Sequence, residues 1–377
     1  RLVSICRRLA GQLGGDAAWA ALEDADAEVV QVSGGITNML YRVAPKKGTA
    51  MHSRAAPILA RVFGQAGDVV CDRRRENVVV AELSEMGFGP KLFGVFANGR
   101  LEHWYADRRP LEPLEMVQAE PVDMQTMIAK RLAEMHQRAS PKVEEVDLWA
   151  QLRDWVALGK KVAFPDDAEK AAKLAKLNPY PRFEEQLDEL EALLPSQRTD
   201  GGRRLLESTG TGASLSAAAR RARELLFEER FCHLDLLSGN IMYSEGVRDV
   251  DFIDYEYSMR TCVGLDVANH FCAVPESCLI LEDTFDVDKY YPSQALQRRW
   301  LSAYYAARRV ELDEEVLDEM LKVVLDFALL AELRWVIWSV VQAGHSPVDF
   351  DYLDYGVMRF EQGFMNYRAW RDRGARP

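Results

Sequence analysis

Short runs in which hydrophobic and polar positions alternate dominate the first hundred residues of the chain. These runs are rich in Val, Ile, Leu and Tyr and are separated by Gly and polar residues, as in β-strands joined by turns. Three runs cover residues 28–32, 39–43 and 57–63, and a fourth lies near 91–96. Between the third and the fourth, Val78, Val79 and Leu83 recur at helical spacing, and Gly87 and Gly89 end that segment. The pattern predicts a small antiparallel sheet with one inserted helix.

Beyond this region the hydrophobic pattern has the period of helices. A stripe of Met and Leu residues ends near Gln137, residues 183–194 form another amphipathic stretch, and the last third of the chain is helical and rich in aromatic residues. Residues 196–222 are rich in Gly, Ser and Ala, which predicts a flexible surface insertion. The expected fold class is therefore α+β, with a small sheet lobe at 1–105 and a larger helical lobe at 106–377.

Charge and cysteine content narrow the class of protein. The chain of 377 residues has 47 Lys and Arg against 59 Asp and Glu, a net charge of −12, whereas nucleic-acid binding requires a clustered positive surface. The six cysteines contain no CxxC pair, so neither a disulfide framework nor a zinc site is indicated. No apolar run approaches the ~20 residues of a membrane span. We expect a cytoplasmic enzyme with no nucleic-acid partner and no stable membrane insertion.

The strongest chemical signal is a polar motif between two apolar strand runs. His233, Asp235 and Asn240 form an HxDxxxxN pattern, and Asp254 follows a second apolar run. Phosphoryl transfer needs a carboxylate beside the acceptor hydroxyl and oxygen ligands for the Mg²⁺ that bridges the nucleotide phosphates. We therefore expect Asp235 to be the catalytic base or orienter, and Asn240 and Asp254 to be the metal ligands. The alternative is a polar turn in which these side chains only cap two strands.

Two features upstream of the motif fit a nucleotide site. A turn between the first two strand runs offers backbone N–H groups and small side chains that could cover phosphates, although an ordinary hairpin turn has the same composition. The turn consists of Ser33, Gly34, Gly35, Ile36, Thr37, Asn38 and Met39. Arg61, on a strand, and Glu76, in the inserted helix, supply the cation and the carboxylate of a phosphate-orienting ion pair. Arg61 here replaces the Lys of protein kinases.

In their order along the chain, these motifs resemble the choline/ethanolamine kinase family. The matching segments are residues 33–39, 59–64, 89–94, 99–103, 233–240, 252–258, 264–271 and 334–343. The resemblance implies a bilobal protein-kinase-like fold, with ATP and Mg²⁺ between the lobes and a cationic amino alcohol, choline or ethanolamine, in the C-lobe. It also implies that His103, Trp104 and Tyr105 form the linker that meets adenine, with Arg109 just after it.

Aromatic residues could hold the ammonium group of the substrate by cation–π attraction. The set consists of Tyr257, Trp335, Trp338, Phe350 and Tyr355. Without a kinase fold these rings would be ordinary core residues, but the resemblance predicts that they surround the amine, with Asp235 and Glu256 also at the substrate. Asp266 and His270 are expected to be structural, with Asp266 holding the catalytic loop through buried hydrogen bonds.

Several alternatives stay open at this point. Leu237 stands where many choline kinases have Gln, as in ethanolamine kinases, whereas residues 99–102 are more like choline kinases, so the preferred amine is not decided. Glu276 comes later than the acidic residue that usually follows Asn-His-Phe in the family. An aminoglycoside phosphotransferase would share HxDxxxxN, and a non-catalytic kinase-like scaffold is the alternative from another class. A homodimer is the assembly to be tested.

Overall fold

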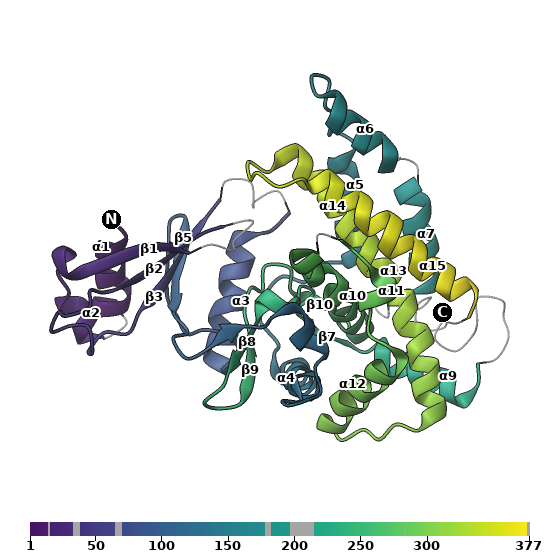
Figure 1. The fold of residues 1–377 in the computed structure, drawn as a ribbon, viewed down its shortest axis with the longest axis horizontal. Coiled ribbons are helices and arrows are strands. Elements are labelled where there is room, and N and C mark those ends of the chain that lie inside the picture. Colours follow the sequence, from purple (N-terminus) through teal and green to yellow (C-terminus); the bar gives the residue numbers. More distant parts are fainter. Residues whose placement is uncertain are drawn as a thin grey trace.

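The computed structural model describes residues 1–13, 16–32, 38–64, 70–177, 182–196, 215–282 and 284–374. A five-stranded antiparallel sheet lies at one end of an elongated molecule, and a helical region makes up the other end (Figure 1). The strands are β1 (Ala27–Val32), β2 (Asn38–Pro45), β3 (Ile58–Phe63), β4 (Leu92–Phe96) and β5 (Gly99–His103), in the order β1-β2-β3-β5-β4. In this register Arg61 of β3 lies opposite Arg100 of β5. The expected α+β bilobal fold is confirmed.

The inserted helix α3 (Arg73–Met86) lies between the sheet and the helical region (Figure 1). Its N-terminus is capped by Asp72, whose carboxylate accepts hydrogen bonds from the backbone of Arg74 and Arg75. Its C-terminus is Gly87, which has a φ of +82° and donates its N–H to the last turn. Local capping chemistry therefore explains where this helix begins and why it ends at the glycine that the sequence predicts.

Three short N-terminal helices were not predicted from the sequence. They are α1 (Leu2–Cys6), the π-helix η1 (Arg7–Leu13) and α2 (Ala17–Ala21), and they pack on the sheet (Figure 1). Trp19 is fully buried, joins Ile58 and Leu101 in a separate hydrophobic core, and donates its indole N–H to the Ala56 carbonyl at 2.9 Å. These helices are shorter than the 11 or more residues over which a helical period can be recognised.

The helical region is built around α13 (Glu314–His345), a helix of 32 residues that packs against α5, α9, α10 and α14. The other helices of this region are α4 (Met124–Arg138), α5 (Leu148–Gly159), α6 (Ala168–Leu177), α7 (Arg182–Leu193), α9 (Ala217–Leu226), α10 (Val263–Glu282), α11 (Val287–Tyr290), α12 (Gln294–Ala307), α14 (Tyr352–Met358) and α15 (Met365–Asp372). The 3-10 helices are η2 (Asp24–Asp26), which precedes β1, η4 (Pro113–Val117) and η5 (Ser238–Asn240), and η6 (Arg359–Phe364) is a π-helix. In the described residues, no helix combines the length and the apolar character needed to cross a membrane.

Two small sheets carry the HxDxxxxN motif. The first pairs β7 (Glu229–Cys232) with β10 (Met259–Cys262), and the second orders β6 (Arg109–Pro110), β8 (Ile241–Ser244) and β9 (Asp249–Phe252) as β6-β8-β9. The motif fills the connection from β7 to β8, and Asp254 is the second residue after β9. These pairings bring the two acidic positions of the motif to one end of the small sheets.

The insertion expected at 196–222 needs a correction at its C-terminal end. Residues 197–214 lie outside the described residues, but Ala217–Leu226 form helix α9. Its N-cap is Ser216, whose hydroxyl accepts the N–H of Ala219 at 3.0 Å. Ala219 and Ala222 are buried against the core. The alanines, from which a loop was predicted, instead allow this helix to pack closely.

Candidate active site

The backbone that precedes Asp235 is held by a buried carboxylate. Asp266 accepts the backbone N–H of His233 at 2.7 Å and that of Leu234 at 2.7 Å. The Nε2 atom of His136 lies 2.9 Å from the same carboxylate. Leu234 has a φ of +61°, a left-handed conformation that a branched residue adopts only under constraint. The predicted role of Asp266 as the residue that holds the loop matches these contacts.

Asn240 and His233 connect Asp235 to the strand that follows. The amide nitrogen of Asn240 donates to the Asp235 carboxylate at 3.0 Å and to its backbone carbonyl at 2.8 Å. The amide oxygen of Asn240 is thereby left as an acceptor. His233 accepts the Asp235 N–H through Nδ1 at 3.3 Å, so its Nε2 carries the proton donated to the Ile253 carbonyl at 3.0 Å. The motif is thus one hydrogen-bonded unit.

The carboxylate of Asp235 lies among other carboxylates. Burial raises the pKa of Asp235 well above its ordinary value, and Glu276, Asp254 and Glu256 raise it further. Arg334 opposes this rise. A carboxylate with a raised pKa accepts a proton more readily than a fully solvated one. The position therefore suits a group that receives a hydroxyl proton.

Arg61 and Asp254 form an ion pair between the sheet and the helical region. The Nη1 atom of Arg61 lies 3.2 Å from one Asp254 carboxylate oxygen and 3.3 Å from the other. Asp254 has a φ of +68°. Burial by itself would raise the pKa of Asp254, but Arg61, together with Arg100 and His233, outweighs that effect and lowers the pKa. Asp254 is accordingly held as an anion.

The direct ion pair expected between Arg61 and Glu76 is not formed. Glu76 instead contacts Arg73 at 2.8 Å and Arg100 at 2.6 Å. Arg61 also lies 3.6 Å from Glu102, which forms a short ion pair with Arg100. Arg100 is the direct strand neighbour of Arg61, so the two guanidinium groups compete for the same two carboxylates. This prediction was wrong because it took no account of the adjacent strand.

Three carboxylates beside this network converge closely enough to hold a cation. Oxygen atoms of Glu76, Asp254 and Glu256 all lie within 4.8 Å of one another. Burial, reinforced by Asp254 and Glu76, raises the pKa of Glu256 to about 7 against the opposing charge of Arg73. Carboxylate and amide oxygens are the ligands that Mg²⁺ prefers, so the donor set fits this ion. With the amide oxygen of Asn240, the predicted ligand positions supply such donors.

The five aromatic residues predicted to bind the amine form a single cluster. Ring centroids lie 5.1 Å apart for Tyr257 and Trp335, 5.4 Å for Trp335 and Trp338, and 6.2 Å for Trp338 and Tyr355. Trp338 donates its indole N–H to the Tyr257 hydroxyl at 2.9 Å. Phe350 adds a ring 5.7 Å from Tyr355 and is 40% exposed, whereas the other four are buried.

A group of charged residues next to this cluster was not predicted, although the sequence analysis noted the late position of Glu276. Arg359 contacts Glu332 at 2.8 Å and Glu276 at 2.7 Å. The Tyr355 hydroxyl donates to Glu276 at 2.6 Å and accepts from Arg359 at 2.6 Å. Arg334 also reaches the cluster and lay inside a segment quoted only for its family likeness. No motif spacing marks these residues, which come from three different helical elements.

The predicted linker residues have different environments. His103 ends β5, and burial lowers its pKa. Tyr105 donates its hydroxyl to Asp251 at 2.6 Å, a contact with β9. Trp104 lies 5.9 Å from the Arg42 guanidinium. Arg109 contacts Glu115 at 2.7 Å and has a side chain that is 42% exposed.

The turn predicted to cover phosphates is described only at its end. Ser33, Gly34, Gly35, Ile36 and Thr37 lie outside the described residues. Asn38 begins β2 and is buried, whereas Met39 is 46% exposed. Asn38 pairs with Phe63 and Met39 with Val62, so both lie on the strand directly next to that of Arg61.

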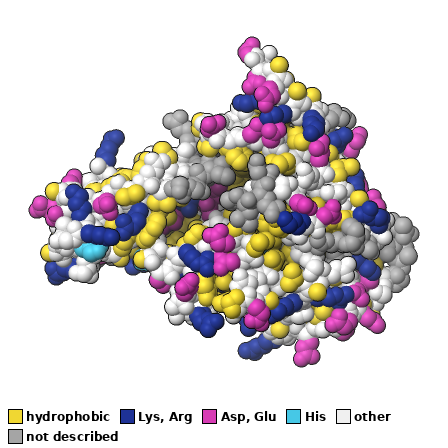
Figure 2. Space-filling model, viewed as in Figure 1, with side chains coloured by type: hydrophobic (Ala, Val, Ile, Leu, Met, Phe, Trp, Pro, Cys, Tyr) yellow, Lys and Arg dark blue, Asp and Glu magenta, His cyan; other side chains and the backbone are white. Residues whose placement is uncertain are grey.

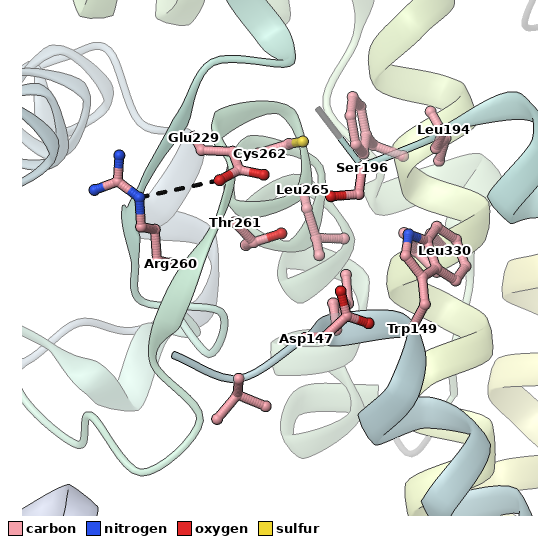
Figure 3. Close-up of a pocket in the computed structure, with 13 residues that line it drawn as sticks. Asp147, Trp149, Leu194, Ser196, Glu229, Arg260, Thr261, Cys262, Leu265 and Leu330 are labelled. Atoms are coloured by element: carbon pink, nitrogen blue, oxygen red, sulfur yellow. Dashed lines mark ion pairs between the residues drawn. The ribbon is translucent and has the colours of Figure 1, made fainter. Parts of the chain in front are cut away.

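A hollow separates the sheet from the helical region on the face seen in Figure 2, with hydrophobic side chains along its walls. A cavity of about 990 Å³ lies between the ends of β3 and β4 and helix α5, and its lining includes Phe63, Arg73 and Trp155. A second cavity of about 30 Å³ lies away from the motif, between α5 and the β7–β10 pair (Figure 3). Arg260 and Glu229, 4.0 Å apart, stand beside it. Its size suits one water molecule rather than a substrate.

The model of the choline/ethanolamine kinase family matches residues 29–364. The chain belongs to the choline/ethanolamine kinase family. A probable ethanolamine kinase A of Dictyostelium discoideum is 30% identical over 344 residues, which cover 90% of this chain and 85% of the relative. A probable choline kinase 1 of Arabidopsis thaliana is 29% identical, over 89% of this chain and 85% of the relative. Members of this family are ATP-dependent amino-alcohol kinases that use Mg²⁺, so the chain is an enzyme of this class.

Solved structures of the family have the same fold. A choline kinase from Cryptosporidium parvum matches with a TM-score of 0.69 at 22% identity, covering 99% of this chain and 96% of that chain. An ethanolamine kinase from Plasmodium vivax matches with a TM-score of 0.69 at 22% identity, covering 97% and 89%. The protein-kinase-like fold implied by the motifs is thus confirmed. The alternative of an aminoglycoside phosphotransferase is not better supported than the amino-alcohol kinase.

Proposed function

We propose that this kinase transfers the γ-phosphoryl group of ATP to the hydroxyl of ethanolamine or choline. The products are ADP and phosphoethanolamine or phosphocholine, and the reaction is the first step of the CDP-amino-alcohol route to phospholipids. The observation that carries the proposal is the meeting of Asp235, the Arg61–Asp254 pair and the aromatic cluster in one region of a chain that belongs to the family.

Asp235 is the group that faces the acceptor hydroxyl. Its carboxylate is oriented by Asn240 and by the backbone contacts of Asp266 to the preceding residues. As the new bond forms between the acceptor oxygen and the γ-phosphorus, the bond to the β,γ-bridging oxygen breaks and ADP leaves. The hydroxyl proton passes to Asp235, whose raised pKa favours that transfer.

The nucleotide lies between the two lobes, with residues 1–105 forming the lobe that covers it. Arg61 and Glu76 belong to the charged network that orients its phosphates, and the family likeness assigns residues 33–39 to phosphate binding. His103, Trp104, Tyr105 and Arg109 border the adenine. Asn240 and Asp254 hold Mg²⁺, which when bound neutralises charge on the phosphates.

The amine lies at the aromatic cluster of Tyr257, Trp335, Trp338, Phe350 and Tyr355. Glu256 adds negative charge next to Tyr257, at a position where its carboxylate contacts Arg73 at 2.8 Å. Aromatic faces and carboxylates together suit a small cation that carries a hydroxyl group. This arrangement supports an amino alcohol rather than a neutral alcohol as the acceptor.

We further propose a cytoplasmic location and a homodimer. The location is supported by the six cysteines, which are all buried and contain no CxxC pair. The dimer is supported by strand β1, an edge strand on which Val29 and Val30 are 44% and 45% exposed. Light scattering on the purified protein tests the assembly, and a monomer at micromolar concentration contradicts it.

A coupled ATP-consumption assay tests the proposed function. ADP release is measured with ethanolamine, with choline, with a panel of aminoglycosides and with no acceptor, and the phosphorylated product is identified by mass spectrometry. We expect release well above the acceptor-free rate for at least one of the two amines. Stimulation by an aminoglycoside alone contradicts the proposal.

A further inference from the structure

The aromatic cluster of the site already contains cations that belong to the chain. The guanidinium carbon of Arg334 lies 4.7 Å from the ring centroid of Trp335 and 5.3 Å from that of Tyr257. The guanidinium carbon of Arg359 lies 5.8 Å from the Trp335 ring and 5.4 Å from the Tyr355 ring. All four distances are within the ~6 Å over which cation–π attraction operates. Three of the rings proposed to hold the amine therefore already face a guanidinium group.

Arg334 is fixed at the end of the cluster closest to Asp235. Its side chain is only 2% exposed, and its Nη1 donates to the carbonyl of Leu234, the residue before Asp235, at 3.3 Å. The Trp155 ring lies 5.6 Å from the guanidinium on a further side. An arginine keeps its charge when buried, so this group is a permanent cation. A ligand cation must bind without displacing it.

Glu276 offers an acceptor at the other end of the cluster. One of its carboxylate oxygens accepts the Tyr355 hydroxyl at 2.6 Å, and the other lies 2.7 Å from Arg359. The Glu276 side chain is 18% exposed. A carboxylate has about four lone-pair positions, so each oxygen can accept a further hydrogen bond. A primary ammonium has three N–H donors for such contacts, whereas a quaternary ammonium has none.

We infer that Arg334 makes this site selective for a primary over a quaternary ammonium, so that ethanolamine is a better acceptor than choline. The inference rests on the proposed function. A quaternary ammonium can be held only by aromatic faces and by net charge, and Arg334 occupies the faces of Tyr257 and Trp335 while repelling a second cation. A primary ammonium is held through hydrogen bonds to Glu276, which Arg334 does not block.

The first experiment uses the unaltered protein. kcat/KM is measured with ethanolamine, N-methylethanolamine, N,N-dimethylethanolamine and choline at saturating Mg·ATP. We expect kcat/KM to fall along this series, by at least about tenfold between the first and the last amine, because each methyl group removes a donor or adds bulk at the occupied rings. Choline used as well as ethanolamine overturns the inference and leaves the proposed function intact. If no amine is phosphorylated, the proposed function itself fails.

The second experiment removes the cation. Arg334→Leu exposes the two ring faces, and we expect the ratio of kcat/KM for choline to that for ethanolamine to rise at least about tenfold. Arg334→Lys keeps a cation and should keep the original ratio. Arg308 is the matched control, since its guanidinium also packs on two rings, Tyr304 and Tyr305, but outside this cluster.

The choline-to-ethanolamine ratio separates selectivity from a purely structural role. Loss of the Arg334 hydrogen bond to Leu234 would lower kcat/KM for both amines alike and leave their ratio unchanged. Arg308→Leu should likewise leave the ratio unchanged. A folded Arg334→Leu protein with an unchanged ratio overturns the inference. If that variant does not fold, the amine series on the unaltered protein still decides the question.

Discussion

Arg61 of strand β3 lies 3.2 Å from Asp254, which follows strand β9, so that one ion pair joins the sheet lobe to the catalytic region. The side chain of Arg61 is 4% exposed and that of Asp254 is 23% exposed. This contact, rather than an Arg61–Glu76 pair, is the charged link between the sheet lobe and Asp254, the predicted metal ligand.

Removing either partner of this pair should destabilise the protein and weaken nucleotide binding. Breaking a buried pair costs up to about 3–5 kcal/mol, and the partial exposure of Asp254 reduces that figure. Arg61→Met, Asp254→Asn and the double variant form a cycle to be measured by urea denaturation. We expect the double variant to lose clearly less than the sum of the single losses. Additive losses would contradict a direct pair.

Arg371 and Asp326, 2.6 Å apart on α15 and α13, are the control for this cycle. Arg371→Met should lower stability without changing the KM for ATP, whereas Arg61→Met should raise that KM. An equal change in the KM for ATP in both variants would mean that Arg61 acts through stability alone.

Asp235→Asn should abolish most of the turnover while leaving Mg·ATP binding in place. The amide has no basic oxygen to take the hydroxyl proton, and the loss of a positioned proton acceptor costs at least ~10²-fold in rate. Calorimetric titration with Mg·ATP and a steady-state assay measure the two properties. Asp318→Asn, at a carboxylate 58% exposed on α13, is the control that should keep full activity. Near-normal turnover in Asp235→Asn would contradict the catalytic role of Asp235.

Trp338→Ala should impair the enzyme in two ways. Trp338 is both a proposed amine contact and a buried ring hydrogen-bonded to Tyr257. Loss of a large buried side chain costs roughly 3–5 kcal/mol of stability, and loss of a cation–π contact should raise the amine KM about tenfold or more with little change in the KM for ATP. Trp338→Phe should lose less stability and raise the amine KM less.

Trp300 separates these two effects, because it is fully buried on α12 and packs on His270 rather than on the amine cluster. Trp300→Phe should lower the melting temperature and leave the amine KM near normal. If Trp338→Phe and Trp300→Phe behave alike in both measurements, the amine-binding role of Trp338 is wrong.

His270 should make stability depend on pH below neutrality. Burial lowers its pKa from the ordinary value near 6.5 to about 4, with its Nδ1 3.0 Å from the Leu236 carbonyl. Between these values the unfolded chain binds a proton that the folded protein does not, so stability present above pH 6.5 is lost as the pH falls toward 4. Urea denaturation at pH 7 and pH 5 measures the loss. His270→Asn should weaken the dependence of stability on pH, because it removes up to one proton from the difference between the unfolded and folded states. An unchanged dependence would contradict this role of His270.

Predictions from neighbouring residues succeeded where the cause is local. Helix α3 is capped by Asp72 at its start and by Gly87 at its end, and such capping is decided within one turn of the chain. The N-terminal helices were missed because five to seven residues do not establish a period. The alanines of α9 were taken for a loop because small residues bury little surface, and only their packing distinguishes the two.

The sequence by itself determined the family, the reaction class and the unit formed by His233, Asp235 and Asn240, because those side chains lie within a few residues of one another and bond through their own backbone. Tertiary structure decided which charges meet. Arg100, rather than Arg61, contacts Glu76 because β5 pairs with β3. No fixed spacing of residues along the chain encodes that pairing. The cations within the aromatic cluster come from α13 and η6. Arg334 reaches Tyr257 and Arg359 reaches Glu276, and both partners lie far away along the chain. Contacts between such elements depend on the packing of the whole helical lobe, and only the fold reveals them.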